Sequence, residues 1–284
     1  MNATPATRTI EVGIGAVTIA DVVDVARNGY GVALTAESLA AIAESRARIE
    51  ALAADPTPVY GVSTGFGALA TRHIPAHLRT QLQRSLIRSH AAGSGPEVER
   101  EVIRALMLLR LSTLATGRTG VRPVVAQAYA DLLTAGITPV VHEYGSLGCS
   151  GDLAPLAHVA MAIIGEGFVR TADGELTDAA TALAAHGLEP VVLAEKEGLA
   201  LINGTDGILG MLCLALHDLS ELARLADVTA AMTVEGLLGT DRAFAADLQA
   251  LRQDASLMAM PRLVLGGGSN ILLLGDFPGL VLRS

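Results

Sequence analysis

The sequence predicts a mainly α-helical protein that ends in a short strand–loop–strand tail. Of its 284 residues, 51% are hydrophobic, which is enough to bury a large core in one or two domains. Alanine and leucine are abundant, and both residue types favour helices. Apolar residues also recur at helical spacing along several segments that are bounded by capping residues, prolines or glycines.

The first helix of this kind follows Thr35, because threonine caps helix N-termini, and Glu37 lies in its first turn. Pro56 and Pro58 end the segment, since proline cannot continue a helix, and Tyr60 is therefore expected on a loop. The apolar positions of this helix are Leu39, Ile42, Ile49 and Leu52.

A second helix is predicted to begin at Pro96 and Glu97 and to run to Gly117, because proline is favoured in a first helical turn. We expect one stripe of this helix to lie in the core. The stripe consists of Val98, Val102, Leu106 and Leu109.

Two later segments are also predicted to be helical. Asp152 and Pro155 suit the first turn of a helix, whose positive end would favour nearby negative charge. The segment from about residue 205 to 238 is rich in leucine and alanine and predicts one or two further buried helices. Within it, His217 and Asp218 are expected to be structural residues rather than ligands.

Charge and cysteine content exclude several classes of protein. The net charge of −9 and the pI near 5.2 argue against binding to nucleic acid, which needs a basic surface. The two cysteines, Cys149 and Cys213, provide no disulfide framework, and no metal-ligand cluster is visible. The N-terminus lacks the features of a signal peptide, and polar residues interrupt the apolar stretches. We therefore expect a cytoplasmic protein without membrane partners.

Residues Gly145 to His158 read GSLGCSGDLAPLAH, and the triplet Cys149-Ser150-Gly151 carries the chemistry. The amide nitrogen of Gly151 is sterically free to attack the carbonyl carbon of Cys149, while the Ser150 hydroxyl can leave as water. Cyclisation with the loss of two waters gives 4-methylidene-imidazol-5-one. Ser-Gly alone would indicate only a glycine-rich turn before a helix.

This motif resembles the loop that forms the prosthetic group of the histidine and aromatic amino-acid ammonia-lyases, where Ala-Ser-Gly is usual and Cys-Ser-Gly also occurs. The resemblance implies a helical lyase fold, of which this chain would be a truncated N-terminal part. It also implies that the group takes up an amino-acid amine and that a general base removes the β-proton as the C–N bond breaks. Ordinary side chains lack such an electrophile.

Three other segments are similar to the same family. Tyr60 opens YGVSTGFG and matches the family's active-site tyrosine, a proton-transfer group, although Ser63 stands where asparagine is commoner. Ser89 and His90 form the Ser-His pair found in members that act on histidine, and two imidazole rings can exchange hydrogen bonds. Asn203, in LALINGTDG, matches the family's active-site asparagine, which implies a buried amide that holds the substrate's ammonium or carboxylate and steadies the prosthetic group.

The tail differs from the lyases after about residue 249. Residues 261–283 predict a strand, a glycine loop at Gly266 to Gly268 and a second strand. They are similar to the start of the flavin-binding domain of UDP-N-acetylenolpyruvoylglucosamine reductases, but a single glycine loop is a weak signal. We therefore divide the chain into a lyase-like part, residues 1–249, and an unrelated tail, residues 250–284, and we do not expect FAD.

The family resemblance implies a histidine ammonia-lyase that acts on a small amino acid and produces urocanate. A tyrosine or phenylalanine ammonia-lyase or aminomutase is an alternative, as is a flavoprotein fragment. Another alternative is an inactive truncated or fused fragment, because family members continue further and take a glutamine, a tyrosine, an arginine and a glutamate from the missing part. A homotetramer is expected for the family, whereas the sequence leaves open whether this shorter chain forms one.

Overall fold

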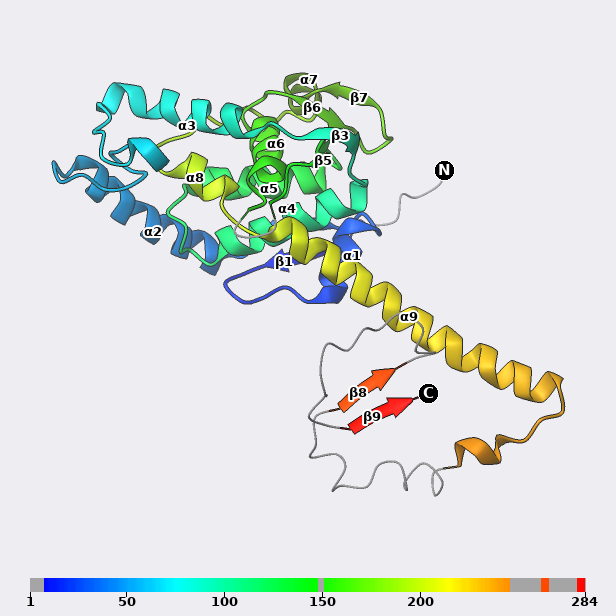
Figure 1. Ribbon diagram of the computed structural model, residues 1–284. Coiled ribbons are helices and arrows are strands. Elements are labelled where there is room, and N and C mark those ends of the chain that lie inside the picture. The colour runs from blue at the N-terminus through cyan, green and yellow to red at the C-terminus, as the bar shows by residue number, and fades with distance from the viewer. Residues whose placement is uncertain (1–7, 148–150, 246–261, 266–279, 284) are drawn as a thin grey trace. The chain divides into compact units, whose positions relative to one another are not determined.

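The computed structural model describes residues 8–147, 151–245, 262–265 and 280–283 (Figure 1). Cys149 and Ser150 of the predicted cyclising triplet lie outside the described residues, as does the predicted glycine loop of the tail. The chain divides into two compact units, Met1–Ser220 and Glu221–Ser284. Each unit is therefore considered by itself.

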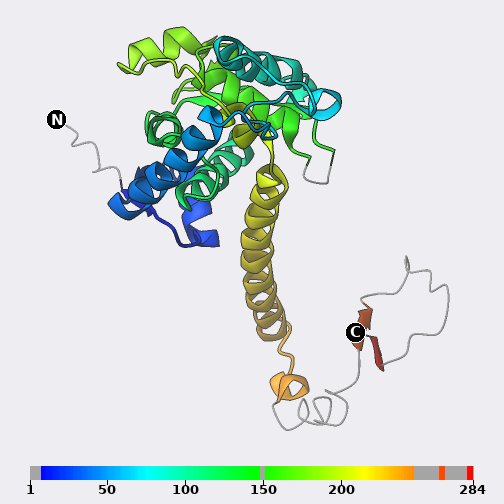
Figure 2. The same ribbon diagram turned by 90° about the vertical axis from the view of Figure 1, so that its left-hand side faces the viewer.

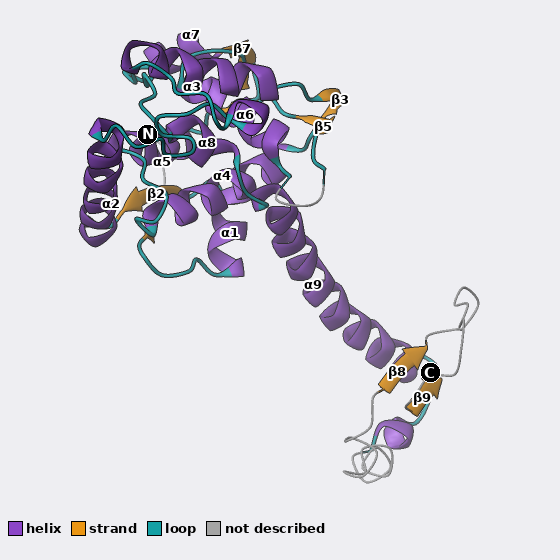
Figure 3. Ribbon diagram, turned by 60° about the vertical axis from the view of Figure 1, so that its left-hand side comes forward, coloured by secondary structure: helices purple, strands orange, loops and turns teal. Residues whose placement is uncertain are grey.

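Helices dominate the first unit and short strands lie at its margins (Figure 3), as the sequence predicted. Each strand is too short to form an extended sheet. The helices of this unit and of the segment that leads into the second are α1 (Ile19–Ala26), α2 (Ala36–Ala54), η1 (Gly67–Leu69), α3 (Ala76–His90), α4 (Arg100–Ala115), α5 (Pro123–Thr134), α6 (Leu153–Ile163), α7 (Ala179–Ala185), α8 (Glu197–Ile202) and α9 (Asp206–Gly236). The strands of the first unit are β1 (Thr9–Val12), β2 (Gly31–Leu34), β3 (Ser94–Glu97), β4 (Thr138–Pro139), β5 (His142–Tyr144), β6 (Phe168–Arg170) and β7 (Leu176–Asp178).

Helix α4 is central to the first unit, where it packs against α1, α2 and α5 (Figures 1 and 2). Every residue from 103 to 111 is buried, so this helix is enclosed on all sides instead of presenting the single core stripe that we expected. Arg104 and Arg110 belong to this buried run, and both donate hydrogen bonds to groups on other elements. Buried arginines are tolerated only when paired in this way.

The helix predicted after residue 96 begins later than expected. Pro96 and Glu97 belong to strand β3, which pairs antiparallel with β5, and α4 begins only at Arg100. The prediction of the helix start was wrong because the first-turn preference of proline is a local signal, whereas this pairing is with a strand about 45 residues further on. The helix predicted after Thr35 is confirmed as α2, and the Thr35 side chain accepts a hydrogen bond from the Ser38 N–H.

The three helices that carry motif residues pack together. Helix α6 packs against α3 and α8, and α3 also packs against α8. The side-chain oxygen Oε1 of Gln83, in α3, accepts a hydrogen bond of 2.9 Å from the Gly198 N–H at the start of α8. A Cβ on Gly198 would lie 2.8 Å from the same oxygen, so a glycine permits this close approach.

Helix α9 is one continuous helix of 31 residues, and the expectation that it is buried was wrong for most of its length. Its buried residues all precede Ala215, and its later apolar side chains, such as Leu219, are exposed. The exposed apolar side chains along α9 are Ile208, Leu209, Met211, Leu212, Leu216, Leu219, Leu222, Leu225, Val228 and Met232.

The stretch Glu197–Gly236 would suffice, by length and composition alone, to cross a membrane. No other helix among the described residues meets that test. Polar residues still interrupt this stretch, among them Asn203, Asp206 and His217, as we expected. The core helices of soluble proteins have the same length and composition, so the finding does not identify a membrane segment.

The second unit contains the rest of α9, the 3₁₀ helix η2 (Asp241–Phe244) and the parallel strands β8 (Arg262–Leu265) and β9 (Leu280–Arg283). The two strands agree with the predicted strand–loop–strand tail, while the loop between them lies outside the described residues. The division after Ser220 falls within α9 and does not test the predicted boundary at residue 249, which stays a prediction.

Candidate active site

A backbone hydrogen bond joins Leu147 to Gly151, the last residue of the predicted triplet. The Leu147 N–H donates to the Gly151 carbonyl oxygen over 3.1 Å. Gly151 is buried, and α6 begins two residues later at Leu153. The triplet therefore immediately precedes the N-terminus of α6, where negative charge is favoured.

The carboxylate of Asp152 joins this loop to the N-terminus of another helix. Its Oδ1 accepts a 2.6 Å hydrogen bond from the Ser146 hydroxyl, and its Oδ2 accepts from the backbone N–H groups of Gly207 (2.8 Å) and Ile208 (3.1 Å). The sequence predicted that Asp152 would serve the first turn of α6. It is the N-cap residue of α6, but its side chain instead satisfies free N–H groups in the first turn of α9.

The turn that carries Asn203 lies between α8 and α9, next to the triplet. The Asp152 N–H donates to the Gly204 carbonyl oxygen over 3.2 Å, which joins the residue after the triplet to the residue after Asn203. Asn203 itself is exposed, so the expectation of a buried amide was wrong. The backbone of the turn is bonded to Asp152, while the Asn203 side chain is accessible to a ligand.

Arg110 forms hydrogen bonds with residues on both sides of this turn. Its Nη1 donates to the Ala200 carbonyl oxygen in α8 over 3.1 Å, and its Nε donates over 2.9 Å to Oδ2 of Asp206, the first residue of α9. The guanidinium Nη2 also pairs with this carboxylate. Sequence reasoning missed Arg110; the available signal was an arginine within the otherwise apolar run of α4.

Ser89 and His90 end helix α3. The Leu86 carbonyl oxygen lies 2.9 Å from both the Ser89 hydroxyl and Nδ1 of His90. If His90 donates through Nδ1, its Nε2 is an acceptor that a ligand can reach, because the ring is only half-buried. Ser89 is exposed, but its hydroxyl points back to the helix backbone.

The chain that follows His90 contacts α6 and the triplet loop. The Gly93 N–H donates to Nε2 of His158 in α6 over 3.1 Å, so that ring must offer a lone pair. Burial lowers the pKa of His158, and the nearby His142, whose ring centroid lies 5.8 Å away, lowers it further. A Cβ on Gly145 would lie 3.4 Å from the Gly93 Cα, which places this segment directly beside the start of the triplet loop.

Tyr60 lies on a loop after α2, as its position after two prolines predicted. Its side chain is 53% exposed, and its ring meets Phe66 edge-on with the ring centroids 6.1 Å apart. A Cβ on Gly61 would lie 3.3 Å from Leu199, so the Tyr60 loop contacts α8, the helix that leads to Asn203. Ser63 is fully buried, and its hydroxyl oxygen accepts from the Val59 N–H.

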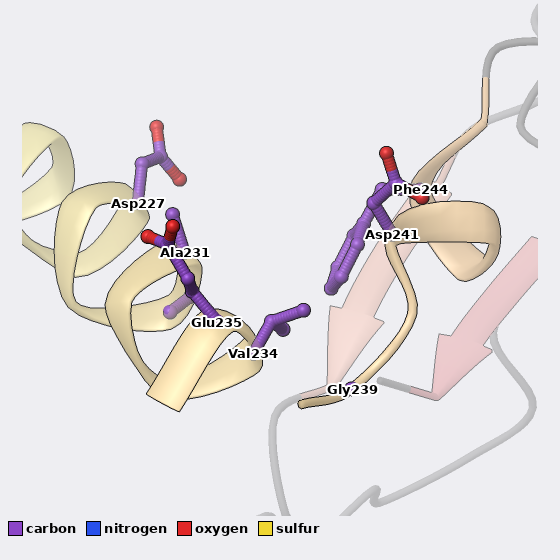
Figure 4. A pocket seen from close by; sticks show the side chains of 8 residues that line it. Asp227, Ala231, Val234, Glu235, Gly239, Asp241 and Phe244 are labelled. Carbon is purple, nitrogen blue, oxygen red and sulfur yellow. The ribbon is translucent and has the colours of Figure 1, made fainter. Parts of the chain in front are cut away.

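The Asn203 turn thus bonds to Asp152 at the start of α6, and the segment after His90 contacts Gly145 and His158. The Tyr60 loop contacts α8, which packs against α6. A cavity of about 430 Å³ belongs to the second unit and is lined by none of the predicted site residues (Figure 4). A cavity of about 130 Å³ lies beside the triplet loop and is lined by Ser146, Asp152 and Gly207 together with apolar side chains of α4 and α9. No group of three or more histidine, cysteine, aspartate or glutamate side chains suited to a metal ion occurs in the part of the chain that the structure describes.

Fold and motifs together define a protein of the ammonia-lyase class, and comparison with known proteins makes the assignment specific. The chain belongs to the aromatic amino acid lyase family, whose model matches residues 17–264. This match extends past residue 249, where we predicted that similarity to the lyases ends.

Among curated proteins, the chain is similar to histidine ammonia-lyase of Streptomyces coelicolor, with 61% identity over 264 residues, 92% of this chain and 52% of that protein. It is also similar to tyrosine ammonia-lyase of Cupriavidus metallidurans, with 48% identity over 73% of this chain and 39% of that protein. The solved histidine ammonia-lyase of Trypanosoma cruzi matches with a TM-score of 0.79 and 35% identity over 86% of this chain and 47% of that one. The chain thus spans about half the length of the curated relatives that it matches.

Proposed function

We propose that this chain carries the triplet-bearing part of a histidine ammonia-lyase site, which converts L-histidine to urocanate and ammonia. The observation that carries this proposal is that the Asn203 turn bonds to Asp152, directly after the triplet, while the segment after His90 contacts Gly145 and His158, which lie before and after it in the chain. The relative with 61% identity is a histidine ammonia-lyase, and the Ser89-His90 pair agrees with that substrate.

The residues around the triplet fit the formation of 4-methylidene-imidazol-5-one from Cys149, Ser150 and Gly151. The bond between Leu147 and Gly151 restrains the ends of the loop, and burial of Gly151 limits competition from water. Such a group supplies an electrophile for the substrate amine. The start of α6 would stabilise negative charge that develops there.

This chain's own residues have separate roles in the proposed reaction. His90 receives the imidazole of L-histidine through a ring nitrogen, and the exposed Asn203 amide binds the substrate's ammonium or carboxylate. Tyr60 is the candidate proton-transfer group, and Ser89 orients His90 through their 3.1 Å contact. In the overall change the substrate loses a β-proton and its C–N bond, and the remaining electron pair forms the new carbon–carbon double bond.

The first test is the mass of the peptide that contains residues 149–151, taken from the purified protein. We expect a deficit of two water molecules in the native sequence and of at most one in Ser150→Ala, which lacks the hydroxyl that leaves as the second water. An unmodified native peptide would refute the formation of the prosthetic group in this chain.

The second test measures turnover. Because the chain spans about half of its relatives' length, it is mixed with a separately produced C-terminal half of a histidine ammonia-lyase. Urocanate absorbance should appear with L-histidine, and His90→Leu should lower the preference for L-histidine over L-tyrosine. Faster turnover of L-tyrosine or L-phenylalanine by the native sequence would favour one of these amino acids as the substrate. The similarity to a tyrosine ammonia-lyase is the reason to test them.

A second candidate is an inactive fragment, and its supporting observation is the same half-length coverage. This candidate predicts that no urocanate forms from L-histidine even after the C-terminal half has been added. We further propose that the protein is cytoplasmic. We also propose that the exposed apolar residues of α9 mediate assembly into the homotetramer expected for the family.

Residues 250–284 are proposed to form a separate tail without FAD. A colourless purified protein would agree with the absence of flavin, whereas yellow colour would contradict it.

A further inference from the structure

Arg110 contacts the Asn203 turn in a way that no motif indicates. Its side chain is 4% exposed and extends from the buried helix α4. It donates to the Ala200 carbonyl oxygen, one of the last carbonyl groups of α8, and to the carboxylate of Asp206 at the start of α9. One guanidinium thus satisfies a free carbonyl at a helix C-terminus and also pairs with the acidic first residue of the next helix.

The backbone of the turn lies directly against this ion pair. A Cβ on Gly204 would collide with Nη2 of Arg110 and with Oδ2 of Asp206, so only glycine fits at this position. The carbonyl oxygen of the same Gly204 accepts the Asp152 N–H, and Asp152 directly follows the triplet. A continuous set of contacts therefore runs from Arg110 through the Gly204 backbone to the residue that adjoins Gly151.

We propose that Arg110 is a positioning residue that holds the Asn203 turn against the triplet loop and so fixes the geometry in which the triplet cyclises. Arg110 touches neither the substrate nor the reacting atoms. Its effect on cyclisation rests on the proposed function, whereas its effect on the two loops does not. The two effects can therefore be measured separately.

Arg104 provides a matched control on the same helix. It is equally buried, at 1% exposed, and its Nε and Nη1 donate to the carbonyl oxygens of Val25 and Leu133. Those carbonyls belong to α1 and α5, so Arg104 anchors α4 without contacting the Asn203 turn. Arg110→Lys and Arg104→Lys both keep a positive charge and remove the planar set of donors.

The experiment compares amide hydrogen exchange in the native chain and in the two lysine variants. In Arg110→Lys we expect exchange at Asp152, Gly207 and Ile208 to rise by about tenfold or more, as the loss of a charge-assisted hydrogen bond implies. In Arg104→Lys the same amides should stay protected. Unchanged protection in Arg110→Lys, or equal loss in both variants, would overturn the proposal.

Two further measurements keep the result decisive. If Arg110→Lys fails to fold by circular dichroism, Asp206→Asn weakens the same ion pair more mildly and should expose the same three amides; if it leaves them protected, the proposal is refuted. The mass of the 149–151 peptide gives the second readout, and the doubly dehydrated fraction should fall in Arg110→Lys but not in Arg104→Lys. A native chain without any dehydration would refute the proposed function, while the exchange result would still decide the role of Arg110.

Discussion

Replacing Glu197 by glutamine tests the buried ion network that holds α8, and with it the Asn203 turn, in place. The Glu197 side chain is fully buried, and each of its oxygens accepts two hydrogen bonds. Oε1 accepts from the backbone N–H and Nε of Arg122, both at 2.9 Å. Oε2 accepts from Nη2 of Arg122 at 2.7 Å and from the Ala194 N–H at 2.6 Å. This carboxylate raises the pKa of Arg122, mainly through its hydrogen bonds.

The expected loss in the free energy of unfolding follows from these four hydrogen bonds. A glutamine amide has one accepting oxygen, so in either orientation its NH₂ group faces two donors. Each unsatisfied donor costs about 1–3 kcal/mol, and breaking a buried ion pair costs about 3–5 kcal/mol. We therefore expect Glu197→Gln to lower the free energy of unfolding by about 4 kcal/mol.

The assay is urea unfolding followed by circular dichroism. With a denaturant slope of about 3 kcal/mol per molar, the unfolding midpoint should fall by about 1.3 M. The matched control is Glu44→Gln, which removes an exposed ion pair with Arg48 one helical turn away and should cost about 0.5 kcal/mol or less. A midpoint for Glu197→Gln within about 0.3 M of the control would refute the reasoning.

Three further predictions concern pH, capping and assembly. Burial and then His142 lower the pKa of His158, so its contribution to stability should be complete above the unfolded value of about 6.5 and should be lost as the pH falls below it. Because the ring is partly exposed, the slope should stay under about 1.4 kcal/mol per pH unit, and urea midpoints from pH 5 to 7.5 should vary less with pH in His158→Gln than in the native protein. Thr18→Ala should lower the free energy of unfolding by about 1 kcal/mol because Thr18 and Asp21 form a capping box on α1, while Thr18→Ser should retain most of it; equal urea midpoints for the two variants would contradict this. Leu219→Asp on the exposed face of α9 should lower the oligomer mass measured by light scattering more than Ser220→Asp does, and an unchanged mass would argue against assembly through this face.

Local signals in the sequence were reliable where neighbouring residues decide the structure. Thr35 caps α2 through its own side chain, and the prolines after α2 leave Tyr60 on a loop, as predicted. The strand pattern of the tail also agrees with β8 and β9. The family could be recognised from short motifs because their chemistry requires particular residue types at fixed spacing.

Predictions failed where a distant segment supplies the hydrogen-bond partner or the covering surface. Pro96 pairs within β3 and not within a helix, because β5 offers a strand edge. The apolar side chains of α9 predicted burial, but packing within the first unit covers only its beginning. Periodicity identifies which residues are apolar but not what covers them.

In the candidate site, too, local features could be predicted from the sequence, whereas contacts between distant segments could not. The sequence by itself determined the helical class and the family, and it predicted the triplet and the residue types around it, because these depend on side-chain chemistry and on neighbours within a few positions. Only the tertiary structure decided that the Asp152 carboxylate caps α9 and that Arg110 holds the Asn203 turn. A buried carboxylate or guanidinium binds whichever unsatisfied donors or acceptors the packing brings within about 3 Å, and that choice is made between segments far apart in the chain.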